Sequence, residues 1–357
     1  MPKKRRACLG SRGDPSATQK CFTYKKEACS LRPLRFRILH MARRVASISC
    51  AVALLLLEYL AAPQGACARG APQFQALPLV RSRQNHLLIR AFINGKPAWL
   101  TVDSGAPVSA IALDRRQYFR LKPATAESNL PARVQINGGF NNVAIAHELR
   151  IGGLALIDEP LVTVDLGGST RAARLANEQQ IDGIIGADIL FPTEAVLDCE
   201  RQLLILKMDP NIAGSAPGLN HRGLKAVPIQ VSEGYNLYVN GSVNGIPARL
   251  MVDTGSFTTL LHRAFVRRMR ISTYETPYSS SAVNLKERGV RVARIRKLSV
   301  GSVDIFGKDV GVIDLEGLIH NGLLQGSPPV AGLLGAETLR RQHGIIDFGT
   351  RTLYLRR

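Results

Sequence analysis

The chain has 357 residues, of which 45% are hydrophobic, and a formal net charge of +20. This length and hydrophobic content predict about two globular domains, each with its own core. Half of the charge excess lies in residues 1–68, which hold 13 Lys and Arg against 3 Asp and Glu. The remaining residues are moderately basic and carry no nucleic-acid-binding motif, so we expect a soluble surface and no nucleic-acid partner.

Residues 1–40 are basic and unpatterned, and we expect an unstructured extension that precedes the true start at Met41. A short basic segment then leads into an apolar run at residues 45–57 and a small-x-small sequence at residues 66–68. These three parts make residues 41–68 typical of a secretory signal peptide. We expect an exported protein, periplasmic or secreted. The alternative is a membrane tether formed by an uncleaved segment, which Glu58 disfavours.

Cysteine usage changes at the same point, because five of the six cysteines lie in residues 1–68 and only Cys199 follows. A lone cysteine forms no internal disulfide, and neither a CxxC sequence nor a close His pair suggests a metal. Cys199 corresponds to Phe348 in the repeat described next, which predicts a buried apolar side chain. We expect no metal and no cofactor.

The rest of the chain contains one unit twice. The stretch with Asp103-Ser104-Gly105 recurs 150 residues later with Asp253-Thr254-Gly255, and residues 76–110 and 226–260 share 12 identities in 35 positions. The correspondence continues to the end of the chain. We therefore expect an N-terminal lobe at residues 76–207, a Gly- and Pro-containing linker at residues 208–225 and a C-terminal lobe at residues 226–357.

Each unit is predicted to be rich in strands. Two β-rich runs meet at an Asn-Gly pair in both copies, Asn94-Gly95 and Asn244-Gly245, which is typical of a hairpin. Short helices are expected at residues 114–121 and 262–269, and after the Gly-apolar-apolar-Gly sequences at residues 183–186 and 332–335. The predicted fold class is therefore all-β with few short helices.

The order of a strand, Asp-Ser/Thr-Gly-Ala/Ser, a long β-rich segment and apolar-apolar-Gly-Ala occurs in both copies. It resembles the retropepsin-like aspartic proteases over essentially all of residues 76–357. Retroviral members build their site from two identical chains, whereas this sequence resembles the single-chain arrangement, with both lobes fused as in pepsins. The resemblance implies two lobes related by a pseudo-twofold axis, a monomer that forms an intramolecular pseudo-dimer, and a catalytic pair formed by Asp103 and Asp253.

The chemistry of such a pair follows from electrostatics. Two carboxylates about 3 Å apart cannot both ionise comfortably, so they share one proton. The ionised partner takes a proton from a water held between them, and the protonated partner donates to the peptide carbonyl. We expect an aspartic endopeptidase acting on peptide or protein substrates. The alternative is a catalytically weak or inactive peptide-binding or scaffold module of the same fold.

The neighbouring residues have expected roles. The hydroxyls of Ser104 and Thr254 can donate across the lobe interface and hold the loops rigid, as the resemblance implies. Gly105 and Gly255 allow a tight turn and bring backbone N–H groups close to the carboxylates. The Gly-apolar-apolar-Gly sequences are expected to pack beneath the two Asp loops.

The two Asp loops differ in sequence. Ala106 stands opposite Ser256, and Pro107 follows in the first copy, where it could alter the backbone beyond the turn. We expect the Ser256 hydroxyl to hydrogen-bond the outer oxygen of Asp253. This contact would favour ionised Asp253 and leave Asp103 as the usual holder of the shared proton.

A substrate-covering flap is expected at the hairpin tip that contains Gly138, Gly139 and Phe140, where the glycines bend the chain and the phenylalanine covers a substrate. The matching residues 284–289 of the second copy are charged and less suited to this role. Four further Asp residues occupy matching places near turns and are expected to form structural hydrogen bonds: Asp165, Asp198, Asp314 and Asp347. The histidines do not recur between the copies, and we assign none of them to the site.

Overall fold

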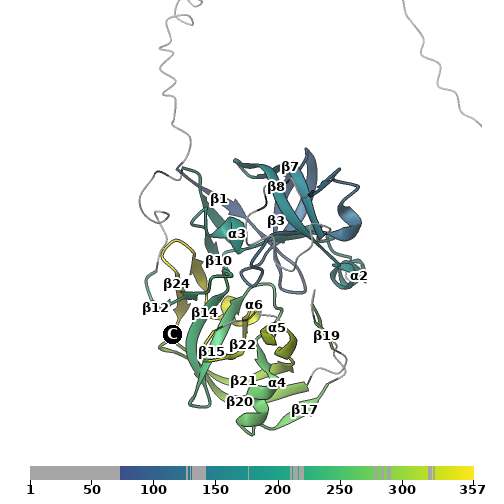
Figure 1. Cartoon of the computed structure of the whole chain (residues 1–357). Coiled ribbons are helices and arrows are strands. Elements are labelled where there is room, and N and C mark those ends of the chain that lie inside the picture. The colour runs from purple at the N-terminus through teal and green to yellow at the C-terminus, as the bar shows by residue number, and fades with distance from the viewer. Residues whose placement is uncertain are drawn as a thin grey trace, which may run out of the picture. The chain divides into compact units, whose positions relative to one another are not determined.

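The structure is a computed structural model that describes residues 73–125, 128, 130, 142–175, 177–209, 211, 216, 221–276, 280–282, 285–287, 291–320, 324 and 326–357. The predicted extension, signal peptide and flap at residues 138–140 lie outside these ranges. Figure 1 shows the first copy, in blue and teal, and the second, in green and yellow, as two lobes built mostly of strands. No helix among the described residues is long and apolar enough to cross a membrane.

The first lobe is a sheet of eight strands in the order β2-β3-β4-β9-β5-β8-β7-β6, and an additional β3–β7 pairing closes six of them into a barrel. At the β3–β4 turn, Asn94 and Gly95 have φ angles of 50° and 76°, as the predicted Asn-Gly hairpin requires. The strands are β2 (Val80–Arg81), β3 (Leu87–Ile93), β4 (Lys96–Val102), β5 (Ala110–Ala112), β6 (Lys122–Pro123), β7 (Val143–Ile151), β8 (Leu154–Val164) and β9 (Gly183–Ile185).

The second lobe repeats this topology strand by strand, in the order β13-β14-β15-β22-β16-β21-β20-β17 with an additional β14–β20 pairing. Its strands are β13 (Gln230–Val231), β14 (Leu237–Val243), β15 (Ile246–Asp253), β16 (Leu260–His262), β17 (Thr273–Glu275), β20 (Arg291–Val300), β21 (Val303–Ile313) and β22 (Val330–Gly335). A separate hairpin pairs β18 (Ser280–Ala282) with β19 (Leu285–Glu287). The predicted all-β fold with two similar lobes is confirmed.

A third sheet joins the two lobes, in the order β1-β11-β10-β23-β24-β12. At its centre Leu197 of β10 pairs with Ile346 of β23. These residues occupy equivalent places in the two copies, so the pseudo-twofold axis passes between them. The strands are β1 (Phe74–Pro78), β10 (Val196–Asp198), β11 (Leu203–Lys207), β12 (Leu224–Pro228), β23 (Ile345–Asp347) and β24 (Thr352–Arg356).

The described helices are short: the 3₁₀-helix η1 (Leu113–Arg115), α2 (Gly167–Leu175), α3 (Ala187–Leu190), α4 (Arg263–Arg268), α5 (Glu316–His320) and α6 (Ala336–Arg341). The predictions for α3, α4 and α6 are confirmed, whereas α2 and α5 were not predicted. The predicted helix at residues 114–121 is wrong. Only η1 forms there, and the following turn ends at Arg120, whose φ of 52° lies in the left-handed region.

The core follows from the alternation of side chains along the strands. On β3, Ile89, Ala91 and Ile93 are buried, while the intervening Arg90 and Phe92 are exposed. Cys199 is buried in the same hydrophobic cluster, and burial raises the pKa of its thiol to about 12. The prediction that this cysteine is an apolar filler is confirmed.

Candidate active site

Both Asp residues of the repeated stretch lie where an inner strand of a barrel ends. Asp103 follows β4 and Asp253 ends β15, and each strand runs parallel to the strand of a Gly-apolar-apolar-Gly sequence. A Cβ on Gly183 would lie 2.4 Å from the carbonyl oxygen of Ala110, and one on Gly332 would lie 2.2 Å from the matching carbonyl. Glycine is therefore needed at these positions for the strands to approach each other.

The carboxyl groups of Asp103 and Asp253 meet across the axis, close enough to hydrogen-bond each other. The N–H of Gly255 serves both, at 3.1 Å from Asp103 Oδ1 and 2.9 Å from Asp253 Oδ1. Further N–H groups donate from Gly105 to Asp103 Oδ1 at 2.8 Å and from Ser256 to Asp253 Oδ1 at 3.0 Å. A Cβ on Gly105 would lie 2.4 Å from Asp253 Oδ1, so this glycine also lies against the opposite lobe's carboxyl.

Burial raises the pKa of both carboxyls, and the negative charge of Asp103 raises the pKa of Asp253 further. The backbone N–H groups oppose this shift by stabilising the ionised forms. Two like charges this close in a buried site cannot both be retained at neutral pH. The pair therefore titrates as a unit and keeps one proton over a wide range of pH.

Ser104 and Thr254 form a symmetric set of hydrogen bonds between the lobes. The Ser104 hydroxyl donates to the Val252 carbonyl at 2.9 Å, and the Thr254 hydroxyl donates to the Val102 carbonyl at 2.8 Å. Each hydroxyl also accepts the other residue's backbone N–H, at 2.9 and 3.1 Å. Both side chains are buried. These four bonds fix the two Asp loops relative to each other.

A second polar contact lies behind each Asp loop. In the first lobe the Ser109 hydroxyl donates to Asp188 Oδ1 at 2.7 Å and accepts the N–H of Gly186 at 2.9 Å. The Ser109 N–H donates to the other Asp188 oxygen at 2.9 Å. One hydroxyl thus connects the end of the Asp loop to the Gly-apolar-apolar-Gly turn.

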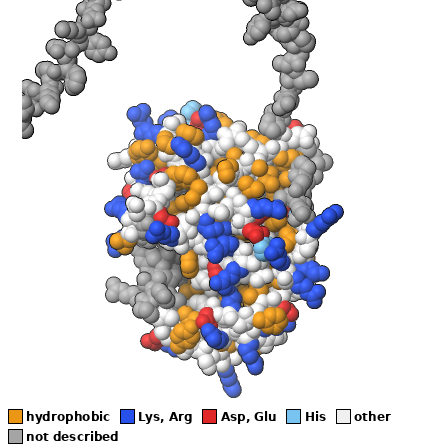
Figure 2. Space-filling model, turned by 180° about the vertical axis from the view of Figure 1, so that it is seen from behind, with side chains coloured by type: hydrophobic (Ala, Val, Ile, Leu, Met, Phe, Trp, Pro, Cys, Tyr) orange, Lys and Arg blue, Asp and Glu red, His pale blue; other side chains and the backbone are white. Residues whose placement is uncertain are grey.

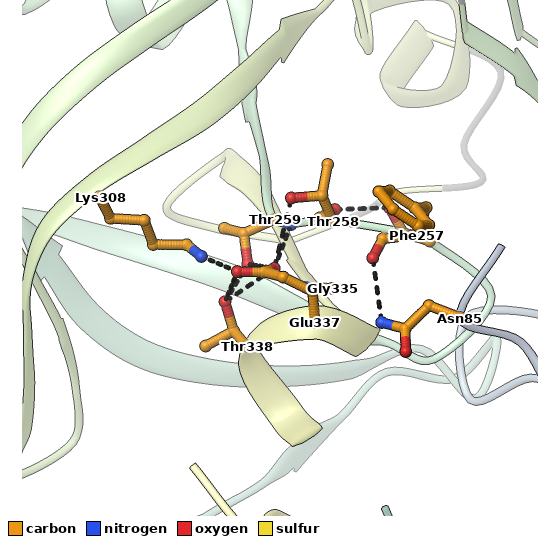
Figure 3. A network of polar contacts seen from close by, with 9 residues as sticks. Asn85, Phe257, Thr258, Thr259, Lys308, Gly335, Glu337 and Thr338 are labelled. Atoms are coloured by element: carbon orange, nitrogen blue, oxygen red, sulfur yellow. Dashed lines mark hydrogen bonds and ion pairs between the residues drawn. The ribbon is translucent and has the colours of Figure 1, made fainter. Parts of the chain in front are cut away.

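Figure 3 shows the equivalent contact in the second lobe, where Thr259 replaces the serine and Glu337 replaces the aspartate. The Thr259 N–H donates to Glu337 Oε2 at 3.0 Å, and its hydroxyl accepts the Gly335 N–H at 3.2 Å. Glu337 also forms an ion pair with buried Lys308. Burial lowers the pKa of Lys308 to about 8, so this lysine is still charged at neutral pH.

Sequence reasoning missed Asp188 and Glu337. A signal for them was present, because both follow a Gly-apolar-apolar-Gly-Ala sequence directly and both are acidic. Their partners, Ser109 and Thr259, also stand at equivalent positions in the two copies. An acid and a hydroxyl that recur together in both units indicate the same contact within each lobe.

The prediction for the Ser256 hydroxyl is wrong. It donates to the Thr258 carbonyl at 2.8 Å, and the backbone N–H of Ser256 contacts Asp253 instead. Serine hydroxyls often bond to backbone groups one or two residues away, and here the Thr258 carbonyl takes the bond that was predicted for the Asp253 carboxylate. The charge of Asp103 moreover favours protonated Asp253, which reverses the expected preference.

Pro107 leaves the docking of the first loop unchanged. The Ala106 carbonyl accepts the Ala187 N–H at 2.8 Å, and the Ser256 carbonyl accepts the Ala336 N–H at 2.9 Å. These two bonds are equivalent in the two lobes. The two loops therefore dock on the following turn in the same way, although the Ala106 N–H donates to the Asp103 carbonyl at 3.3 Å and the Ser256 N–H donates to the Asp253 carboxylate.

The hairpin β18–β19 of the second lobe lies against helix α2 of the first lobe, and Figure 1 shows both at the side of the molecule where the lobes face each other. The flap at residues 138–140 stays a prediction, and the contact between β18 and α2 is a separate one that crosses the lobe boundary.

The four turn Asp residues accept backbone N–H groups, as predicted. Asp198 Oδ1 accepts from Arg201 at 2.8 Å, and Asp347 Oδ1 accepts from Thr350 at 2.9 Å. The other two acids each accept an N–H from two residues further on. Asp165 Oδ1 accepts from Gly167 at 2.8 Å, and Asp314 Oδ1 accepts from Glu316 at 2.9 Å. These carboxylates have structural roles.

One group of potential metal ligands occurs within the described part of the chain, formed by His262, Asp314 and Glu316 with ligand atoms within 4.8 Å of one another. The Leu315 N–H donates to His262 Nδ1 at 3.2 Å, so the neutral ring carries its hydrogen on Nε2. This Nε2 lies 3.5 Å from Glu316, and Arg263 pairs with Asp314 at 3.1 Å. The contacts indicate a hydrogen-bonded cluster at the start of α5.

Comparison with known proteins agrees with this geometry. The sequence model of a family described as aspartyl protease matches residues 89–189 and 239–338, one region in each lobe. Each matched region begins in the strand before the Asn-Gly hairpin and ends just beyond the Gly-apolar-apolar-Gly sequence. No curated protein matches the chain.

Proposed function

Since the chain belongs to the aspartyl protease family, we propose that it is an endopeptidase that hydrolyses peptide bonds with a water activated between Asp103 and Asp253. The observation that supports this most strongly is the Gly255 N–H, which lies within hydrogen-bonding distance of both carboxylates. Two buried acids held by one donor are arranged to share a proton.

In the proposed reaction, ionised Asp103 accepts a proton from the water as its oxygen attacks the peptide carbonyl. Protonated Asp253 donates to the carbonyl oxygen, so the tetrahedral intermediate forms without a covalent bond to the protein. As the C–N bond of this intermediate breaks, the newly protonated Asp103 gives its proton to the leaving nitrogen, and Asp253 takes back a proton from one hydroxyl of the intermediate as the new carboxyl group forms. The dyad returns to its singly protonated form, and atoms and charge balance.

The alternative is a catalytically weak or inactive peptide-binding module of the same fold. Both Asp-Ser/Thr-Gly units and the bonds between Ser104 and Thr254 are intact, which favours catalysis. The test is incubation of the full chain with a peptide mixture across a range of pH, read by mass spectrometry, with Asp103→Asn as the blank. New termini that are absent from the blank support the endopeptidase, whereas peptide binding without cleavage at any pH supports the alternative.

Ion pairs on the second lobe weigh against a nucleic-acid surface. On β20, three basic residues each pair with an acidic side chain, Arg291 with Glu275, Arg294 with Asp309 and Lys297 with Asp304. Figure 2 shows Lys and Arg side chains spread over much of one face, with acidic side chains among them. The proposed partners are therefore peptides or proteins, and the pseudo-dimer of lobes within one chain supports a monomer.

The sequence of residues 41–68 supports export as the proposed location, with a membrane tether as the alternative. Expression of the full chain in a bacterium, followed by mass spectrometry of the N-terminus, separates the two. A new N-terminus directly after Ala68 in a soluble fraction supports export. An intact segment in the membrane fraction supports the tether.

A further inference from the structure

His86 of the first lobe contacts the active loop of the second. It lies in the turn between β2 and β3, and its Nε2 is 3.2 Å from the carbonyl oxygen of Gly255. The neighbouring Asn85 donates from Nδ2 to the Phe257 carbonyl at 3.3 Å, a contact drawn in Figure 3. The turn is itself braced, because the Ser82 hydroxyl accepts the His86 N–H at 3.1 Å.

The hydrogen must lie on His86 Nε2 in this contact, since a backbone carbonyl only accepts. The carbonyl belongs to the same peptide group as the N–H of Ser256, which donates to Asp253 Oδ1 at 3.0 Å. Donation at one end of a peptide group polarises it and strengthens the donor at the other end. His86 thereby supports the ionised state of the carboxyl pair through the backbone.

His86 also interacts directly with the pair. Burial lowers the pKa of this histidine below its ordinary value, and Asp103 and, more weakly, Glu178 oppose that shift only in part. The charge of protonated His86 in turn lowers the pKa of Asp103. Within the described residues, His86 Nδ1 and Glu178 Oε2 are buried without a hydrogen-bond partner. A proton arriving on Nδ1 would thus place a positive charge on a ring that interacts with two acids, Asp103 and Glu178, while Nε2 keeps its contact with the Gly255 carbonyl.

The second lobe has the same turn without an imidazole. The Ser232 hydroxyl accepts the N–H of Asn236 at 3.1 Å, as Ser82 does for His86, so Asn236 occupies the equivalent backbone position. An amide side chain does not titrate. The imidazole therefore acts on only one side of the pseudo-twofold axis.

We propose that His86 is a positioning residue of the dyad, which fixes the Gly255–Ser256 peptide and favours the singly ionised form of the carboxyl pair. The consequence for the rate rests on the proposed function, but the consequence for carboxyl titration does not. Because protonation of His86 adds a positive charge beside Asp103, the effect is largest at low pH, where the first carboxyl ionises. His86 extends the range of the singly ionised pair to lower pH.

The test is a ¹³C NMR titration of the Asp103 and Asp253 carboxyls in the full chain, assigned with the Asp→Asn variants. His86→Leu removes both the donor and the charge. We expect the pKa of the first ionisation of the carboxyl pair to rise by about 1 unit in this variant. His86→Gln keeps a donor but not the charge, so a smaller rise is expected. The matched control is His147→Gln, at an exposed histidine that pairs with Asp158 on the outer surface, and no shift is expected there.

In a cleavage assay, the pKa of the acidic limb of the kcat/KM profile should move in each variant by as much as the carboxyl titration moves in that same variant. Titration curves of folded His86→Leu and His86→Gln that coincide with those of wild type overturn the inference. If His86→Leu does not fold, His86→Gln decides by the same criterion. A wild type that cleaves no peptide but shows the shift refutes the proposed function and leaves the role of His86 supported.

Discussion

Leu197 and Ile346 face each other in paired antiparallel strands at the centre of the sheet that joins the lobes. Each is the other's counterpart in the repeat, and both side chains are fully buried. A residue that pairs with its own counterpart fixes the position of the pseudo-twofold axis. The same axis brings Asp103 and Asp253 together, so the inter-lobe sheet and the carboxyl pair are consequences of one symmetry.

The close approach of each glycine to the opposite carboxyl predicts a strong effect of added side-chain volume. A Cβ on Gly255 would lie 2.2 Å from Asp103 Oδ2. We expect Gly255→Ala to reduce kcat/KM for a peptide by about 100-fold or more, because it displaces a reacting group. Gly317→Ala is the matched control, since a Cβ there meets nothing within 4 Å, and it should retain wild-type kinetics. Equal activity of the two variants would contradict the geometry.

The bonds between Ser104 and Thr254 predict a loss of stability when one hydroxyl is removed. Thr254→Val keeps the shape of the side chain but leaves the Val102 carbonyl and the Ser104 N–H buried without this partner. We expect the free energy of unfolding in urea to fall by about 1–3 kcal/mol. Thr254→Ser restores the hydroxyl and should recover most of the loss. An unchanged denaturation midpoint in Thr254→Val would show that these bonds contribute nothing.

The raised pKa of Asp253 predicts a pH-dependent stability difference. In the native state this group holds its proton above the pH at which the unfolded chain releases it, so stability falls as pH rises from the unfolded pKa to the native pKa. Asp253→Asn lacks this loss and still offers an acceptor to the Ser256 N–H. Between pH 4 and pH 8, we expect the free energy of unfolding of the variant to increase relative to that of wild type. The increase should be about 1.4 kcal/mol for each unit by which the native pKa of Asp253 is raised. Urea denaturation at pH 4 and pH 8 measures the gain, and equal differences at both values would contradict it.

The Glu337–Lys308 ion pair predicts a strong coupling between two substitutions. Glu337→Gln leaves the buried Lys308 without its anion, and Lys308→Met leaves Glu337 with its hydroxyl and N–H donors only. Each single variant should lose stability, the first by about 3–5 kcal/mol. The loss of stability in the double variant should be smaller than the sum of the losses in the two single variants, and the difference should be about 0.5–3 kcal/mol. Simple additivity in a double-mutant cycle would mean that the pair makes no net contribution.

The sequence predicted much of this architecture because the duplication marks it. Asp103 and Asp253, the Asn-Gly hairpins and the Gly-apolar-apolar-Gly turns recur at matching places, and the structure uses each pair in the same way in both lobes. Recurrence also carried the signal for Asp188 and Glu337, although it was not recognised. Residues that are shared between copies were therefore accessible without coordinates.

Residues that occur in only one of the two copies could not be found by looking for recurrence. His86 has Asn236 as its counterpart, so a search for repeated residues passes over it. The acceptor of the Ser256 hydroxyl is likewise set by the geometry of the turn, which places the Thr258 carbonyl 2.8 Å from it. Likewise, the contact between β18 and α2 joins segments whose spacing in the sequence gives no hint of proximity.

The central claim is that both carboxyls are needed for peptide hydrolysis. The direct measurement is kcat/KM for one cleaved peptide with Asp103→Asn, Asp253→Asn and the turn variant Asp165→Asn, all checked for native secondary structure. We expect each dyad variant to lose about 10²–10⁴-fold, while Asp165→Asn retains wild-type activity. Cleavage at the wild-type rate by either dyad variant would contradict the account.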